Sequence, residues 1–416
     1  MRKFRNQHLS YSRRGSLIPA VAVAIVVFGG AMALVLNRFW ISIGQEELET
    51  VVQSAALSAA TQLASDDLLR DRFDDRWHIE RLNVIRENVE EFVSADRVMG
   101  KQPVIPQVSG IEFGRLVSSS LTGQVNFLQT NAFPNTVLVT GVCRESDRNS
   151  VSLLMPFLTG RSKADLLKRA EASIRNDIVG LRPFVDVGIP MWPLGLLNDD
   201  EVEQVFSLES GSASSRLEDQ YSWDSATGSV LNEPDGLPEI VVEFHSDPAL
   251  ATGCVIELGN RLESATVQIQ IEFGITASQL ENSGGWIDFQ QFPVSKNCGW
   301  TIDQGVFDRL KSKIGQARIV GLCTATAEEA ETSQQAEVVG TAVLKRLVGA
   351  RLMSVQQTST STIAVFQEAV VCTRTAVPAG SGSPAFSELS FTENAGLHPY
   401  IYRVELTRHV DAGLSY

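Results

Sequence analysis

Residues 17–36 read LIPAVAVAIVVFGGAMALVL, a run of twenty residues without one charged side chain. An α-helix rises about 1.5 Å per residue, so a helix of this length crosses a hydrocarbon core about 30 Å thick. We therefore expect a transmembrane helix that begins at Leu17, includes Val26 and ends at Leu36. The lipid bilayer is the first partner that the sequence predicts.

The charges on either side of this run predict its orientation. Five basic residues and no acidic residue precede it: Arg2, Lys3, Arg5, Arg13 and Arg14. Just after it, Arg38 is outnumbered by three glutamates within residues 46–49. By the positive-inside rule, residues 1–16 form a basic cytoplasmic segment, the helix crosses the inner membrane once, and the remaining chain is exported. A secretory signal cleaved at Ala31-Met32-Ala33 is the alternative, but the apolar run continues past that site, which favours a retained anchor.

The helical pattern continues beyond the membrane, and no proline separates the two parts. Apolar and small side chains recur there at i, i+3 and i+4 spacing, which predicts one continuous helix over about residues 17–69. The stripe on one face of this helix consists of Leu48, Val52, Ala55, Ala56, Ala59, Ala60 and Leu63. Small side chains let another element approach closely, so we expect the stripe to pack on the chain's own ectodomain or on another subunit.

The rest of the chain predicts an α+β ectodomain in which strands dominate. Changes in composition and periodicity divide it into five regions. These are a juxtamembrane helical stalk (37–98), a first strand-rich exported region (99–208), a linker or loop (209–238), a second strand-rich exported region (239–377), and a flexible link with a C-terminal strand (378–416).

Individual elements follow from local periodicity. Residues 136–140, 239–244 and 317–322 predict strands, and so do residues 266–271, where three apolar side chains alternate with polar ones. Short helices are expected at residues 164–176, 277–282 and 305–314.

Composition limits the classes of partner. Without the five basic residues of the N-terminus, 30 basic residues face 49 acidic ones, a net charge of −19. Nucleic acid and anionic lipid surfaces attract basic proteins, so nucleic-acid binding is not expected. The five cysteines lie far apart at positions 143, 254, 298, 323 and 372. In an oxidising compartment they allow two disulfides and one spare thiol, with buried thiols as the alternative.

The sequence offers no catalytic constellation. It contains no GxSxG, HExxH, Walker A or GxGxxG pattern and no metal-ligand spacing, and its five histidines are isolated. We therefore predict a protein that is not an enzyme and that needs no cofactor or metal.

Two segments near the N-terminus resemble a known family. Arg13-Arg14-Gly15 precedes the apolar run, and residues 48–60 read LETVVQSAALSAA after it. This arrangement resembles the N-terminal segment of TadG-like proteins of Flp (Tad) pilus assembly. Further resemblance lies in IEFGRL at residues 111–116, FPNTVLVT at residues 133–140 and PFLTG at residues 156–160.

The resemblance implies a non-enzymatic, membrane-anchored component of Flp/Tad-type pilus assembly or of a related surface export apparatus. Its N-terminal helix would contact pilin-like or Tad apparatus proteins, with the ectodomain in the periplasm. Two alternatives stay open. One is a membrane-tethered surface binding protein unrelated to pili. The other is an anchored hydrolase, which needs a deep polar pocket that joins a histidine to an acid.

Overall fold

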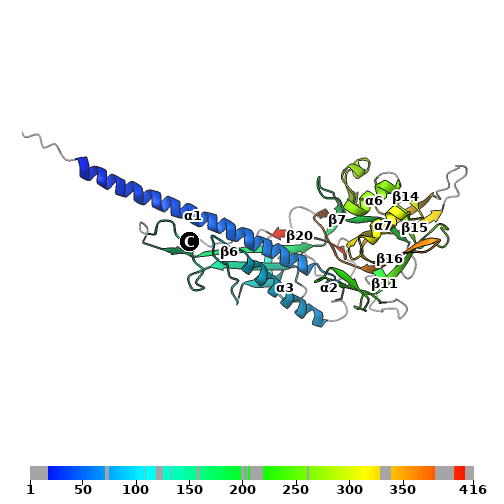
Figure 1. The fold of residues 1–416 in the computed structure, drawn as a ribbon, viewed down its shortest axis with the longest axis horizontal. Coiled ribbons are helices and arrows are strands. Elements are labelled where there is room, and N and C mark those ends of the chain that lie inside the picture. The colour runs from blue at the N-terminus through cyan, green and yellow to red at the C-terminus, as the bar shows by residue number, and fades with distance from the viewer. Residues whose placement is uncertain are drawn as a thin grey trace, which may run out of the picture.

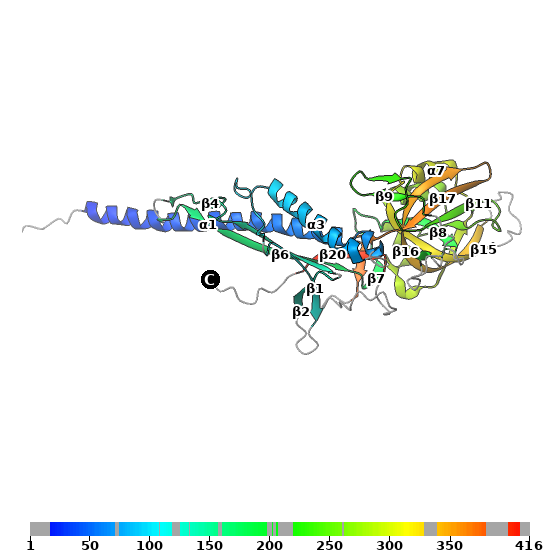
Figure 2. The same cartoon turned by 90° about the horizontal axis from the view of Figure 1, so that it is seen from below.

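The protein is described by a computed structural model in which two parts follow each other along one axis (Figures 1 and 2). The anchor part combines a long helix with a six-stranded sheet, and the barrel part is a strand-rich body beyond the far end of that helix. The structure describes residues 17–70, 75–107, 109–118, 125–132, 134–156, 160–197, 202, 205–206, 219–259, 262–327, 339–379 and 398–407.

The anchor part begins with α1 (Leu17–Leu63), a single helix of 47 residues. The short helix α2 (Asp67–Arg70) and the longer α3 (Asp75–Ala95) follow. The predicted helix thus ends earlier than residue 69. The reason lies in the residues that follow Leu63, where Ser65 donates a side-chain hydrogen bond to Asp67 (3.2 Å) and Leu68 N–H bonds to Ser65 O (3.0 Å). Ser and Asp compete with the helix by such local bonds and favour a break.

Six strands form the sheet of the anchor part, in the order β18-β20-β6-β3-β1-β2. All neighbours are antiparallel except β18 and β20. The helix α1 lies along one face of this sheet, above β6 and β3, with α3 beside it (Figures 1 and 2). The strands are β1 (Ile111–Ser118), β2 (Val125–Gln129), β3 (Thr136–Cys143), β6 (Leu166–Arg175), β18 (Val371–Cys372) and β20 (Ile401–Thr407).

The helix predicted at residues 164–176 is wrong, because the structure has β6 there. The segment LLKRAEASIR contains strong helix formers, which is what the prediction relied on. In the fold, its backbone pairs with β3 on one side and with β20 on the other, while α1 covers one face. Pairing at both edges and packing against α1 therefore override the weak helix propensity of the segment.

The barrel part is a seven-stranded sheet that closes on itself. Its order is β11-β17-β16-β14-β12-β8-β15, and β15 also pairs with β16. Five strands, from β16 through β14, β12 and β8 to β15, thus form a ring, and β17 and β11 extend it. The strands are β8 (Met191–Leu197), β11 (Glu239–His245), β12 (Gly253–Ile256), β14 (Val294–Gly299), β15 (Ala317–Ala327), β16 (Val339–Gln357) and β17 (Ser361–Glu368).

Two helices and two 3-10 turns accompany the barrel. They are α6 (Ser264–Phe273), α7 (Gln304–Lys311), η1 (Ser278–Ser283) and η2 (Phe289–Gln291). The strand predicted at residues 266–271 is wrong, because α6 occupies it. Val267 and Ile271 are buried while Ile269 is 48% exposed, which is helical i, i+4 spacing rather than alternation. Two apolar residues four positions apart satisfy both patterns, so the sequence was ambiguous here.

Short strands complete the fold. β7 (Ile178–Leu181), β13 (Ile287–Asp288) and β19 (Ala376–Pro378) form a three-stranded sheet. β9 (Ser222–Asp224) and β10 (Ser229–Leu231) make a hairpin within the predicted linker, and β4 (Val151–Ser152) pairs with β5 (Lys163–Ala164). In the sequence, the barrel part is inserted between β6 and β18, two strands of the six-stranded sheet, and β20 then follows in that sheet. Strands from the first strand-rich region (β1, β2, β3 and β6), from the second (β18) and from the C-terminal region (β20) therefore share one sheet.

Candidate functional site

The helix α1 has two halves with opposite environments. In its first half the side chains of Val26 and Phe28 are 72% and 75% exposed, whereas all seven residues of the predicted stripe are 0% exposed. Leu36 is half-buried, and the side chain of Leu17 lies outside the described residues. By length and composition, α1 is the one helix in the described ranges that could cross a membrane. The structure thus leaves apolar surface bare where the transmembrane segment was predicted.

The second half of α1 is seated on the chain's own sheet. Leu48 and Val52 lie above Gly141 of β3, where an added Cβ would come within 2.5 Å of Val52 Cγ2 and 3.3 Å of Leu48 Cδ1. The missing side chain of Gly141 therefore allows the helix to approach the sheet. Leu82, Ile85, Val89 and Val93 of α3 belong to the same buried cluster. Of the two partners considered for the stripe, the structure places it against the ectodomain.

Polar contacts fix the rotation of α1 about its axis. Glu49 Oε2 lies 2.7 Å from Lys168 Nζ of β6, and Glu47 Oε2 accepts a hydrogen bond from Met99 N at 2.8 Å. The turn at Met99 and Gly100 sits against Gly44, where an added Cβ would meet Met99 Sδ at 2.4 Å. Glu47 and Glu49 lie about 200° apart around the helix axis, so their contacts flank the buried stripe on its two sides and fix which face of α1 meets the sheet.

A second set of contacts holds the hairpin β4–β5 against α1 just beyond the predicted span. The amide of Asn37 accepts from Met155 N at 3.0 Å and donates to Met155 O at 3.3 Å. Trp40 Nε1 donates to Ser152 O at 3.0 Å. Asn37 is 4% exposed, so the chain's own hairpin covers the helix at this level.

The far end of α1 is joined to the barrel through Asp66. Its Oδ2 lies 2.5 Å from Arg351 Nη2 of β16, and its Oδ1 accepts from Val370 N at 2.7 Å. Arg351 also donates to Gly315 O at 2.6 Å, and its guanidinium stacks 4.4 Å from the centre of the Trp223 ring. The charge of Asp66 is thus paired, and α1 and the barrel are tied at a defined point.

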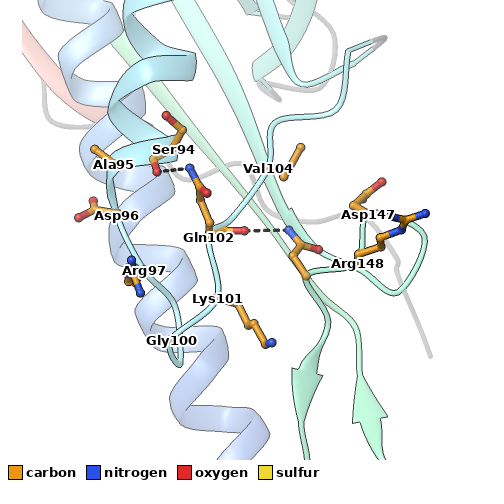
Figure 3. A pocket seen from close by; sticks show the side chains of 11 residues that line it. Ser94, Ala95, Asp96, Arg97, Gly100, Lys101, Gln102, Val104, Asp147 and Arg148 are labelled. Carbon is orange, nitrogen blue, oxygen red and sulfur yellow. Dashed lines mark hydrogen bonds between the residues drawn. The ribbon is translucent and has the colours of Figure 1, made fainter.

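A polar pocket lies where the end of α3 meets the turn after β3 (Figure 3). Its volume is about 490 Å³, and it is lined by residues 94–97, 100–102, 104 and 147–149. Gln102 Nε2 donates to Ser94 O at 2.5 Å, and Asn149 Nδ2 donates to Gln102 O at 2.9 Å. Its charged side chains are of both signs, and no histidine lines it. The pocket therefore does not join a histidine to an acid, as an anchored hydrolase needs.

Three cysteines meet inside the barrel. Cys254 Sγ lies 3.8 Å from Cys323 Sγ, and Gly195 of the intervening strand β8 leaves room for both sulfurs. Hydrogen bonding with Cys298 and Cys323, together with burial, raises the pKa of Cys254 well above its ordinary value. The thiolate is the reactive form, so this cluster is chemically quiet. Among the described residues, no group of three or more His, Cys, Asp or Glu side chains has an arrangement that could hold a metal ion.

His398 is half-buried between the two parts of the molecule. Its Nδ1 accepts hydrogen bonds from Tyr400 N and Ile401 N, and its Nε2 lies 3.2 Å from Leu347 O. Burial lowers the pKa of His398 to about 3. A neutral imidazole with both nitrogens engaged serves structure rather than proton transfer.

The chain matches no protein-family model, no curated protein and no solved structure. Sequence reasoning predicted the stripe, which is buried, and the long apolar helix that could span a membrane, but it missed Asn37 and Asp66. Asn37 directly follows the uncharged run and Asp66 follows the stripe by three residues, and these positions are the signal that the sequence carried for them.

Proposed function

We propose that this chain is a non-enzymatic, membrane-anchored component of a Flp/Tad-type pilus assembly or a related surface export apparatus. The first half of α1 crosses the inner membrane with the N-terminus in the cytoplasm. The barrel part is then carried into the periplasm. Within the bilayer, the bare half of α1 contacts the helices of pilin-like or Tad apparatus proteins.

One observation carries this proposal, namely the division of α1 into a bare apolar half and a half buried in its own ectodomain. Because the stripe is already occupied, contacts with other subunits fall to the span. Small residues there permit close helix approach, and no atom lies within 4 Å of an added Cβ at Gly29 or Gly30. The two glycines thus form an open notch on the membrane half of the helix.

Gene deletion and substitution of Gly29 and Gly30 test the proposed function. Deletion of the gene in the native cell should abolish surface pili, and the wild-type gene should restore them. The double variant Gly29→Leu/Gly30→Leu should insert and fold normally, since it fills open space, yet it should restore few pili and co-purify with fewer apparatus proteins. Val27→Leu, at an exposed position on the same helix, is the matched control and should complement fully.

The alternative is a membrane-tethered surface binding protein unrelated to pili. Its support is the barrel part, which stands away from the bare helix and exposes the edge strand β11, with Val241 60% exposed. Unchanged pili after deletion of the gene would contradict assembly and favour this function.

A further inference from the structure

The hairpin β4–β5 is held at the level of α1 where the bare apolar run ends. Within the hairpin, Leu153 N–H bonds to Ser162 O at 3.0 Å. The side-chain amide of Asn37 bonds to both the N–H and the carbonyl oxygen of Met155. Asn37 is the first residue after the uncharged run 17–36. The contact of Met155 with α1 therefore lies within one helical residue, about 1.5 Å along the axis, of the predicted end of the span, and α1 is also covered one turn earlier, at Ala33, which is 0% exposed.

The tip carries apolar side chains at this level. Leu153, Leu154, Met155 and Pro156 follow one another, and Leu154 is 51% exposed. Trp40, hydrogen-bonded to Ser152 of the same hairpin, is an aromatic residue of the kind that favours the boundary between hydrocarbon and headgroups. Behind the tip the chain becomes polar, and Lys163 there is 47% exposed and pairs with Glu145 Oε1 at 3.1 Å. An apolar tip followed by polar chain suits a segment that lies at a membrane interface, where only its end leaves water.

We infer that the tip of the β4–β5 hairpin inserts into the outer headgroup region of the same bilayer that α1 crosses. This inference rests on the proposed membrane anchoring. The ligand is the lipid surface, and Leu154 is the residue that enters it. A single helix leaves the ectodomain free to tilt and swivel, whereas a second contact, held to α1 by Asn37 and Trp40, fixes its height and orientation above the membrane.

The structure also argues against a protein occupant for Leu154. A protein partner would have to reach the tip at the depth of the lipid headgroups, next to Asn37, which the hairpin itself already covers. Leu154 is exposed next to Met155, which bonds to Asn37 directly after the apolar run of α1. Lipid that surrounds the span therefore reaches Leu154 without any rearrangement.

The test uses fluorescence quenching in proteoliposomes. Three variants of the full chain, Leu154→Cys, Val26→Cys and Val241→Cys, are labelled with an environment-sensitive NBD probe and reconstituted with lipids that carry a nitroxide at a shallow or a deep acyl position. Unsubstituted protein taken through the same labelling gives the background from the native cysteines, of which Cys143, Cys254, Cys298 and Cys323 are buried.

We expect the probe at Leu154 to lose most of its emission with the shallow quencher, and the probe at Val26 to lose it with the deep quencher. The probe at Val241, on the exposed edge of the barrel, should be unaffected. Quenching at Val26 but not at Leu154 would overturn the hairpin inference and leave the anchor intact. Absence of quenching at Val26 would instead overturn the membrane anchor itself.

A second test introduces a negative charge into the tip. In a Leu154→Cys protein that also carries Met155→Asp, the acid beside the probe should keep the tip out of the lipid, and shallow quenching should fall to the level at Val241. The probe at Val26 in a Met155→Asp protein should stay quenched, which shows that the variant is folded and inserted. Unchanged quenching at Leu154 in the acidic variant would contradict apolar insertion.

Discussion

Glu239 is a nearly buried carboxyl at the start of β11 and illustrates how one residue links stability to pH. Its oxygens accept hydrogen bonds from Gln220 N (2.8 Å) and Tyr221 N (3.1 Å). Burial raises the pKa of Glu239 from 4.5 to about 7, and the nearby charges of Asp219 and Asp235 add to the shift. The folded state therefore favours the protonated form of this side chain.

A raised acidic pKa means that the stabilisation is present below the unfolded pKa and is lost as the pH rises through the folded one. We expect the free energy of unfolding to fall between about pH 4.5 and about pH 7, with Glu239 contributing at most about 3 kcal/mol. Urea denaturation of wild type and Glu239→Gln over this range measures the contribution. The difference between the two curves should change with pH, and a constant difference would contradict the assignment.

At the scale of elements, the seat of α1 on the sheet depends on small side chains. Ala56 and Ala59 are 0% exposed within the contact. Replacing either by Trp should lower the free energy of unfolding by about 1–3 kcal/mol, because the added volume overpacks a tight contact. Ser at the same positions should have little effect, since its hydroxyl can bond within the helix.

Thermal unfolding of the purified chain measures these effects. Ser54→Trp is the matched control, because Ser54 lies on the exposed side of the same helix. If Trp at Ala56 or Ala59 were as harmless as Trp at Ser54, the helix would not be seated as the structure describes.

The same elements show what the sequence could predict. The stripe 48–63 was predictable because one face of this half of α1 is buried and the opposite face is exposed to solvent. The apolar residues therefore recur with the helical period. In β6 the residues from Ala170 to Arg175 are all buried, polar ones included. Apolar and polar residues do alternate from Ala170 to Arg175, but alanine, glutamate and the preceding leucines are also good helix formers, and the prediction followed that preference. Asn37 and Asp66 act through partners more than 100 positions away in the sequence, which no local pattern encodes.

At the scale of the whole molecule, Asp66 couples the two parts. Asp66 and Arg351 are 13% and 10% exposed, and removal of one partner leaves an uncompensated charge away from water. We expect Asp66→Ala to cost about 3 kcal/mol, and a double-mutant cycle with Arg351→Ala to show a strong coupling energy.

The surface pair Lys163–Glu145 is the control for this prediction. Its side chains are 47% and 70% exposed, so the same cycle there should yield less than about 1 kcal/mol. Calorimetry reports the consequence for the molecule, because without the Asp66 contact the anchor and barrel parts should melt in two separated steps. Equal coupling energies for the two pairs would show that Asp66 does not join them.

The insertion of the barrel between β6 and β18 has a mechanical consequence. A pull on the barrel part along the axis of α1 enters the first sheet through β6, which is hydrogen-bonded to β3 over most of its length and to β20 along its second half. Since these strands run along α1 (Figure 2), the load acts parallel to the strands and strains many hydrogen bonds together in shear. Tension applied to the barrel part is thereby carried down the sheet that α1 packs on, without breaking its hydrogen bonds one at a time.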